Sequence, residues 1–168
     1  MDKMKHLKTT TSDTVRFRGL SISLRLVGTG FMAFFGTALI LGISGWDRWL
    51  AQYQWGRTCI SLARWDQGSI ATEMMLATVC FVWGAFLWRS ANEPLRHGLF
   101  IDFTLAAHFG HIGLMSVMAA VIPNQTHHYG GDILIGWISW LQIAIFWFPV
   151  RQHSVHVKTH PSSTAFMA

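Results

Sequence analysis

The feature that most constrains this chain is a set of four apolar segments, each about as long as a helix that crosses a bilayer. A helix spans the hydrocarbon core of a membrane with about 20 mostly apolar residues. The four segments cover residues 24–45, 70–88, 98–122 and 130–150. Soluble proteins rarely contain four buried helices this long and this apolar. The sequence therefore predicts an all-α fold, a bundle of four transmembrane helices.

The composition agrees with a membrane domain and sets its limits. Only 12% of the 168 residues are charged and 51% are hydrophobic, whereas soluble domains carry about 25% charged residues. We expect a four-helix membrane domain over residues 23–151, a basic tail over residues 1–22 and a second tail over residues 152–168. No small-residue cleavage site follows the first apolar segment, so we expect it to be retained rather than removed as a signal peptide.

The first connection, residues 46–65, is rich in tryptophan. Trp side chains favour the headgroup level of a membrane, where the ring is in apolar surroundings and the N–H meets water. We expect this connection to lie along the outer surface as an interfacial helix, with an irregular loop as the alternative.

The orientation of the bundle follows from its Lys and Arg residues, which favour the cytoplasmic side of a membrane. The side that carries both termini has ten of the 13: Lys3, Lys5, Lys8, Arg16, Arg18, Arg25, Arg89, Arg96, Arg151 and Lys158. The other side has Arg48, Arg57 and Arg64. We therefore expect both termini in the cytoplasm and the protein in the inner (cytoplasmic) membrane. The basic surplus suits anionic lipids, and no aromatic and basic patch predicts nucleic-acid binding.

Ionisable side chains inside the apolar segments are the strongest functional signal, because they are costly in a membrane. His108 and His111 lie near the middle of the third segment, whereas Glu73 and Asp132 lie near the outer ends of the second and fourth. If these helices face one another, the four side chains make a polar pocket that could hold a transition metal. The histidines also belong to a polar stripe with helical spacing, formed by His97, Ile101, Thr104, His108, His111 and Met115.

Three interpretations of this candidate site stay open: polar contacts between helices, the head of a quinone or a bound lipid, and a metal or haem. Bis-His ligation of haem needs histidines on two facing helices, but both mid-membrane histidines lie on one segment. A haem within one chain would need His127 or His128 from the outer connection, or a Met ligand; a haem between subunits is a further alternative. Otherwise we expect His127 and His128 to be an exposed pair in a loop.

Catalytic motifs are missing from the sequence, which has no nucleophile elbow, P-loop, HExxH or dinucleotide fingerprint. We expect a non-catalytic accessory or structural subunit that packs against partner helices, lipids or lipid-soluble cofactors in a larger complex or a homo-oligomer. The sequence favours a protein without enzymatic activity but leaves the question open. The alternatives are a metal- or haem-binding redox protein that uses the His and carboxylate site, and a small proton or solute transporter.

A series of short motifs runs through the second half of the chain. They are EMM at 73–75, WRSANEPLRH at 88–97, HFGHIGLM at 108–115, GGD at 130–132 and the closing Pro149. In their order and spacing, the residues from Glu73 to Pro149 resemble a family of small four-helix bacterial integral membrane proteins, a domain of unknown function. The chain departs from the family pattern in its Trp-rich connection, its long tails and its second histidine, His111. The resemblance implies a four-helix membrane fold in a bacterium and brings no activity.

Overall fold

A computed structural model describes residues 11–62, 64–65 and 69–159, and within these residues the fold is helical without a strand. Four long helices and three short ones follow one another along the chain. They are α1 (Thr11–Ser44), α2 (Trp46–Leu50), α3 (Gln54–Ser61), α4 (Ile70–Ser90), α5 (Gly98–Val121), the 3₁₀ helix η1 (Thr126–Gly130) and α6 (Asp132–Thr159).

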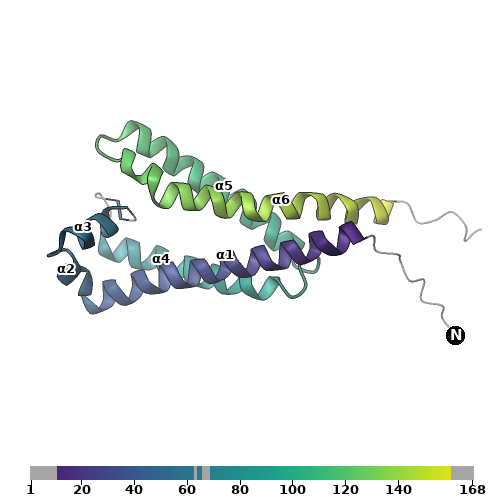
Figure 1. The fold of residues 1–168 in the computed structure, drawn as a ribbon, viewed down its shortest axis with the longest axis horizontal. Helices are drawn as coiled ribbons and strands as arrows, with labels where there is room; N and C mark the ends of the chain where they lie inside the picture. The colour runs from purple at the N-terminus through teal and green to yellow at the C-terminus, as the bar shows by residue number, and fades with distance from the viewer. Residues whose placement is uncertain (1–10, 63, 66–68, 160–168) are drawn as a thin grey trace, which may run out of the picture.

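Four of these helices, α1, α4, α5 and α6, are long and apolar enough to cross a membrane. They run up and down in turn, so that the described ends of the chain lie at the same end of the molecule (Figure 1). The predicted four-helix fold is therefore confirmed, and the chain is a multi-pass membrane protein. We call the end with the chain termini the basic end, and the end with α2 and α3 the Trp-rich end.

The helices form two pairs that share a core only toward the basic end. Helix α1 packs along α4 and helix α5 packs along α6, and α1 also contacts α6. Figure 1 shows the two pairs close together near the termini and apart at the Trp-rich end. The shared core consists of Leu20, Leu24, Val27, Leu87, Ala91, Ile101, Leu105, Ile143, Ala144, Trp147 and Val150. A separate small cluster, Ile112, Ala119 and Ile133, joins α5 to α6, and Trp65 packs against it.

The pair α1 and α4 is held at close range by two glycines. A Cβ atom on Gly28 would lie 2.6 Å from the Gly84 carbonyl oxygen, and one on Gly84 would lie 2.7 Å from the Phe31 Cβ. Small residues allow helix backbones to approach in this way, which is a common basis of helix packing in membranes.

The first and last of the long helices, α1 and α6, extend beyond the apolar segments predicted from the sequence. Helix α1 begins at Thr11, not near residue 24, and α6 continues to Thr159, beyond the expected boundary at 151. Leu20 and Leu24 are fully buried in the shared core, so packing continues the helix past its most apolar part. The tail boundaries at residues 22 and 152 are therefore not helix boundaries. Residues 1–10 and 160–168 of the expected tails lie outside the described residues.

The Trp-rich connection is helical, but the expected single interfacial helix is divided into α2 and α3. Gly56 explains the division, because its Cα approaches the end of α2 so closely that a Cβ there would lie 2.1 Å from the Leu50 carbonyl oxygen. The second short helix thus folds back against the first. Trp46, Trp49 and Trp55 are exposed, as the headgroup-level prediction requires.

Candidate functional site

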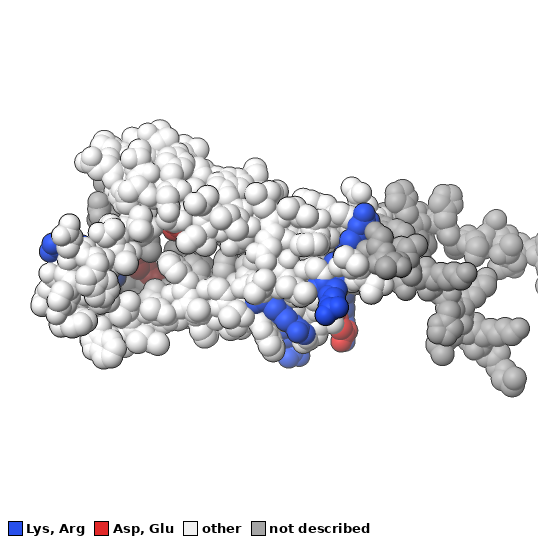
Figure 2. All heavy atoms as spheres, in the orientation of Figure 1, with Lys and Arg blue, Asp and Glu red and all other residues white. Residues whose placement is uncertain are grey.

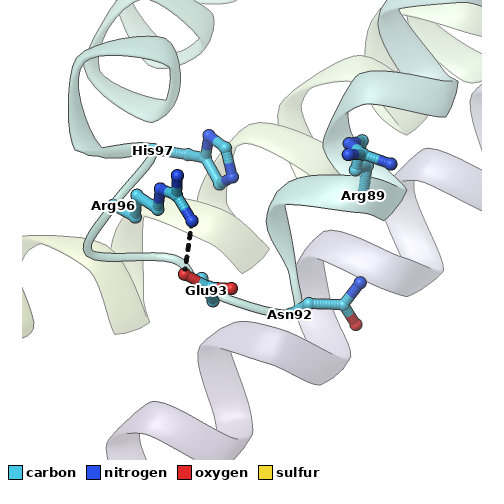
Figure 3. A pocket seen from close by; sticks show the side chains of 5 residues that line it. All are labelled: Arg89, Asn92, Glu93, Arg96 and His97. Atoms are coloured by element: carbon cyan, nitrogen blue, oxygen red, sulfur yellow. Dashed lines mark hydrogen bonds and ion pairs between the residues drawn. The ribbon is translucent and has the colours of Figure 1, made fainter.

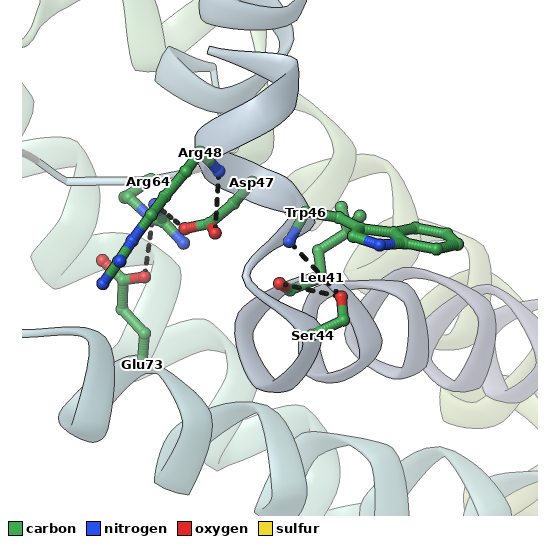
Figure 4. Close-up of polar contacts among 7 residues, drawn as sticks. All are labelled: Leu41, Ser44, Trp46, Asp47, Arg48, Arg64 and Glu73. Atoms are coloured by element: carbon green, nitrogen blue, oxygen red, sulfur yellow. Dashed lines mark hydrogen bonds and ion pairs between the residues drawn. The ribbon is translucent and has the colours of Figure 1, made fainter.

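The Trp-rich end of the molecule contains a network of charged side chains centred on Arg64 (Figure 4). The Arg64 Nε donates to Glu73 Oε2 at 2.7 Å, and a terminal guanidinium nitrogen donates to Asp47 Oδ2 at 3.1 Å. Asp47 is only 6% exposed, and its other oxygen accepts from the Arg48 backbone N–H. Arg64 therefore joins the start of α4 to α2 and pairs with two carboxylates.

A second network surrounds Asp132, the first residue of α6. One carboxylate oxygen accepts from the Trp65 Nε1 at 3.1 Å, and the other lies 2.9 Å from His128 Nδ1. The Trp65 and His128 rings are stacked, with centroids 4.2 Å apart and planes within 12°. His128 is 0% exposed. It is therefore a buried part of the structure, and the expectation of an exposed His127–His128 pair was wrong.

The two networks are joined because Arg64 and Trp65 are adjacent in the chain. Arg64 contacts α2 and α4, whereas Trp65 contacts η1 and α6. We call this dipeptide the Arg64–Trp65 strap. Just before it, the Leu62 carbonyl oxygen accepts from the Asp132 N–H at 3.4 Å and would lie 2.5 Å from a Cβ on Gly131. The strap thus connects the two helix pairs at the Trp-rich end, where they share no apolar core.

His108 makes a polar contact between α5 and α6 deep in the membrane-spanning part. Its Nε2 lies 3.2 Å from the Gly136 carbonyl oxygen of α6. Its ring also contacts the Phe31 ring of α1, with centroids 5.5 Å apart, and the Trp83 ring of α4 at 6.5 Å. One imidazole on α5 therefore touches all three of the other long helices.

The remaining residues of the predicted stripe have different surroundings. Thr104 is buried and accepts from the Trp83 Nε1 at 3.0 Å. Met115 packs against the small α5–α6 cluster. His97 precedes α5 and lines a pocket at the basic end. His111 is exposed; it lies three residues from His108 and so shares roughly the same helix face. At His108, this face contacts α1, α4 and α6.

The four residues expected to form a metal site are not brought together. Glu73 pairs with Arg64, Asp132 with His128, and His108 with a backbone carbonyl. Among the described residues, no three His, Cys, Asp or Glu side chains are grouped so that they could hold a metal ion. The physical reason is that side chains from the connections already form an ion pair or a hydrogen bond with each carboxylate. The prediction from helix faces did not include the connections.

Two buried polar atoms in these networks have no hydrogen-bond partner among the described residues, Glu73 Oε1 and His128 Nε2. A buried acceptor or donor without a partner costs about 1–3 kcal/mol. These atoms are therefore the places in the networks where a water molecule or a ligand group would be stabilised.

Sequence reasoning found Glu73 and Asp132 but missed the residues that organise them. Arg64 counted only as an outer positive charge and Trp65 only as an interfacial aromatic. The available signal was their adjacency, because neighbouring side chains in an extended segment point in opposite directions. A cation and an indole donor next to one another can therefore reach two different carboxylates.

Compared with protein-family models, with curated proteins and with solved structures, the chain gives no significant match. The resemblance of residues 73–149 to the uncharacterised four-helix family therefore stays a prediction.

Proposed function

We propose that this protein is a non-catalytic accessory subunit of the bacterial inner membrane, which packs against an apolar helix of a larger assembly. The observation that carries the proposal is the divergence of the two helix pairs. Figure 2 shows the surface hollowed between them toward the Trp-rich end, with acidic atoms visible in the hollow. Small interhelical gaps in membranes are filled by helices or lipid chains, because an empty apolar gap loses dispersion contacts.

The polar networks support a structural role rather than a chemical one. The carboxylates of Asp47 and Asp132 have both oxygens engaged by protein donors. Such saturated carboxylates fix the spacing of helices and are poorly placed to exchange protons with a substrate. Exposed apolar side chains, by contrast, occur on every span, among them Phe34, Val79, Phe109 and Ile138.

We infer that the exposed His111 side chain, one turn from His108 on α5, faces this hollow. A helix is then the favoured occupant, because it can offer a polar partner as well as apolar side chains. Polar side chains between membrane helices form hydrogen bonds worth about 0.6 kcal/mol on average, and they help to fix register. A saturated lipid chain offers no partner for an imidazole. The proposed partner therefore presents a Ser, Thr, Asn or Gln opposite His111.

The orientation that we propose places both termini in the cytoplasm. The ten basic residues on the side of the termini support it, and in Figure 2 basic side chains gather at that end. The hollow then opens toward the outer half of the bilayer.

Photo-crosslinking in native membranes tests the accessory role. A photoreactive residue in place of His111 is expected to give one discrete adduct with another membrane protein, which also co-purifies in fixed stoichiometry after mild detergent extraction. Leu99, which is 84% exposed near the basic end, is the control position. Lipid adducts alone at position 111, together with a partner-free monomer in native mass analysis, would contradict the proposal.

A second candidate, a small proton or solute transporter, is favoured by one observation, the exposed His111 beside the half-buried His108. Histidine can exchange protons near neutral pH, and intramembrane ionisable groups mark transport paths. Purified protein in vesicles with an internal pH dye distinguishes the candidates. A proton flux that His111→Gln abolishes would favour the transporter over the accessory subunit.

A further inference from the structure

The turn between α4 and α5 forms a pocket of about 270 Å³ at the basic end. It is lined by Arg89 from the last turn of α4, by Asn92, Glu93 and Arg96 from the turn itself, and by His97 at the start of α5 (Figure 3). Polar networks at the Trp-rich end do not involve these residues. The pocket is thus separate from the site described above.

The charge of the pocket favours an anion. The lining contains two guanidinium groups and one carboxylate. The ion pair among them, Arg96 to Glu93 at 3.3 Å, is largely in solvent, with side chains 75% and 61% exposed. An exposed pair of this kind is worth about 0–1 kcal/mol, so an incoming anion can compete for Arg96 at little cost. Guanidinium groups bind phosphate oxygens with two parallel hydrogen bonds.

A third guanidinium stands next to the pocket. Arg25 of α1 donates to Asn92 Oδ1 at 3.0 Å, and its charge lies 6.0 Å from the centre of the Trp88 ring. Because Asn92 accepts through its oxygen, its amide N–H groups are left as donors. The bond also ties the α4–α5 turn to α1, which keeps the pocket residues in place.

Apolar side chains beside the pocket distinguish a lipid from a free anion. Trp88 and Leu95 are exposed next to it, and Leu99 and Phe103 form an exposed apolar strip along α5. The Phe86 and Phe100 rings, with centroids 6.2 Å apart, close the contact between α4 and α5 just inside the membrane-spanning part. A headgroup in the pocket would therefore leave its acyl chain against an apolar helix surface.

We propose that this pocket binds the phosphate group of an anionic phospholipid, with Arg89 and Arg96 holding the phosphate and the acyl chain lying along Leu99 and Phe103. Basic pockets between membrane helices at a headgroup level bind anionic lipids in this way. The site would fix the depth of the α4–α5 turn in the bilayer. It does not depend on whether the protein has a partner subunit.

Native mass spectrometry of the full-length protein in detergent tests the proposal, with phosphatidylglycerol, phosphatidylcholine and inorganic phosphate as probes. Phosphatidylglycerol is expected to bind best. The double substitution Arg89→Gln and Arg96→Gln should weaken its binding about 10- to 30-fold, since each basic residue near a headgroup contributes about a factor of 5. Arg48→Gln with Arg57→Gln, the same loss of charge at the Trp-rich end, should leave binding nearly unchanged.

Three results would overturn the proposal. Equal binding of phosphatidylcholine would exclude recognition of the anionic headgroup, and equal weakening by the control variant would show a general effect of net charge. Inorganic phosphate that binds as tightly as the lipid would show a free-phosphate site. Arg89→Lys with Arg96→Lys keeps the charge, so partial recovery with this variant would support a guanidinium-specific phosphate contact. Near-ultraviolet circular dichroism of the nine tryptophans checks that each variant is folded.

Discussion

At the scale of single residues, Arg64 holds two carboxylates from different segments. Its guanidinium serves Asp47 and Glu73 together, and Asp47 is the more deeply buried of the two. Removing one partner of a fully buried ion pair costs about 3–5 kcal/mol. Because the Arg64 side chain is 32% exposed, water screens part of this interaction and the cost is smaller.

We therefore expect Arg64→Gln to lower the free energy of unfolding by about 1–3 kcal/mol, with the loss arising mainly from the unpaired Asp47 carboxylate. Thermal denaturation in detergent, followed by tryptophan fluorescence, measures it. Arg48→Gln is the matched control, because the Arg48 side chain has no ion pair within the described residues. If both variants melt at the same temperature as the wild type, the Arg64 network does not stabilise the fold.

His108 gives a second residue-scale prediction. His108→Gln should keep most of the stability, because an amide can still donate to the Gly136 carbonyl oxygen. His108→Ala loses this bond and the contacts with Phe31 and Trp83, and we expect a loss of about 1–2 kcal/mol. The same denaturation measurement compares them. A Gln variant as unstable as the Ala variant would indicate that the imidazole ring contacts, and not the hydrogen bond, are what matters.

The polar residues also show what the sequence can and cannot predict at this scale. Depth in the membrane follows from position in an apolar segment, so Glu73 and Asp132 were correctly expected near the ends of their helices. Their partners lie at separations of 9 residues for Arg64 and Glu73 and 67 for Trp65 and Asp132. Helical periodicity does not continue through the connection between the helices. The helix faces predicted from the sequence therefore could not show that these residues pair.

At the scale of the helices, the α1–α4 contact depends on the absence of side chains at two positions. Gly28 and Gly84 face one another's backbones, whereas a methyl group added at Gly30, two residues along α1, would have nothing within 4 Å. Gly28 and Gly30 were both visible as small residues in the sequence. Only the structure separates the one at the helix contact from the one on the open side.

This difference predicts opposite effects for the same substitution. Gly28→Ala and Gly84→Ala should each cost about 1–3 kcal/mol, because the helices must move apart. Gly30→Ala should be neutral or stabilise the protein by up to about 1 kcal/mol, since alanine is the better helix former. Thermal denaturation of the three variants under identical conditions tests the pair contact. Similar effects at all three positions would place the α1–α4 contact elsewhere.

The four spans were predictable because apolar length alone determines them, and their starts and ends agree closely for α4 and α5. The extension of α1 before residue 24 was not, because it depends on packing against the other helices, as at the fully buried Leu20. The division of α2 from α3 likewise depends on the close approach of Gly56 to Leu50. Contacts between segments decide these features, and hydropathy does not record them.

At the scale of the whole molecule, the orientation of the bundle is open to a direct test with the protein's own cysteine. Cys59 is exposed in α3 at the Trp-rich end, and Cys80 is buried in α4. In intact cells, a membrane-impermeant maleimide should label Cys59 from outside. Glu93→Cys, in a variant with both native cysteines replaced, should be labelled only after the membrane is opened. The reverse pattern would place both termini outside.

The divergence of the two helix pairs also has a mechanical consequence for the surrounding bilayer. A molecule whose helices converge at one end and separate at the other displaces more area from one leaflet than from the other. Such a wedge relaxes curvature stress when the lipids of the two leaflets differ in shape. In the leaflet at the basic end, lipids with headgroups wider than their tails would therefore fit best around the narrow end. A change in lateral pressure within the bilayer would act on the angle between the pairs.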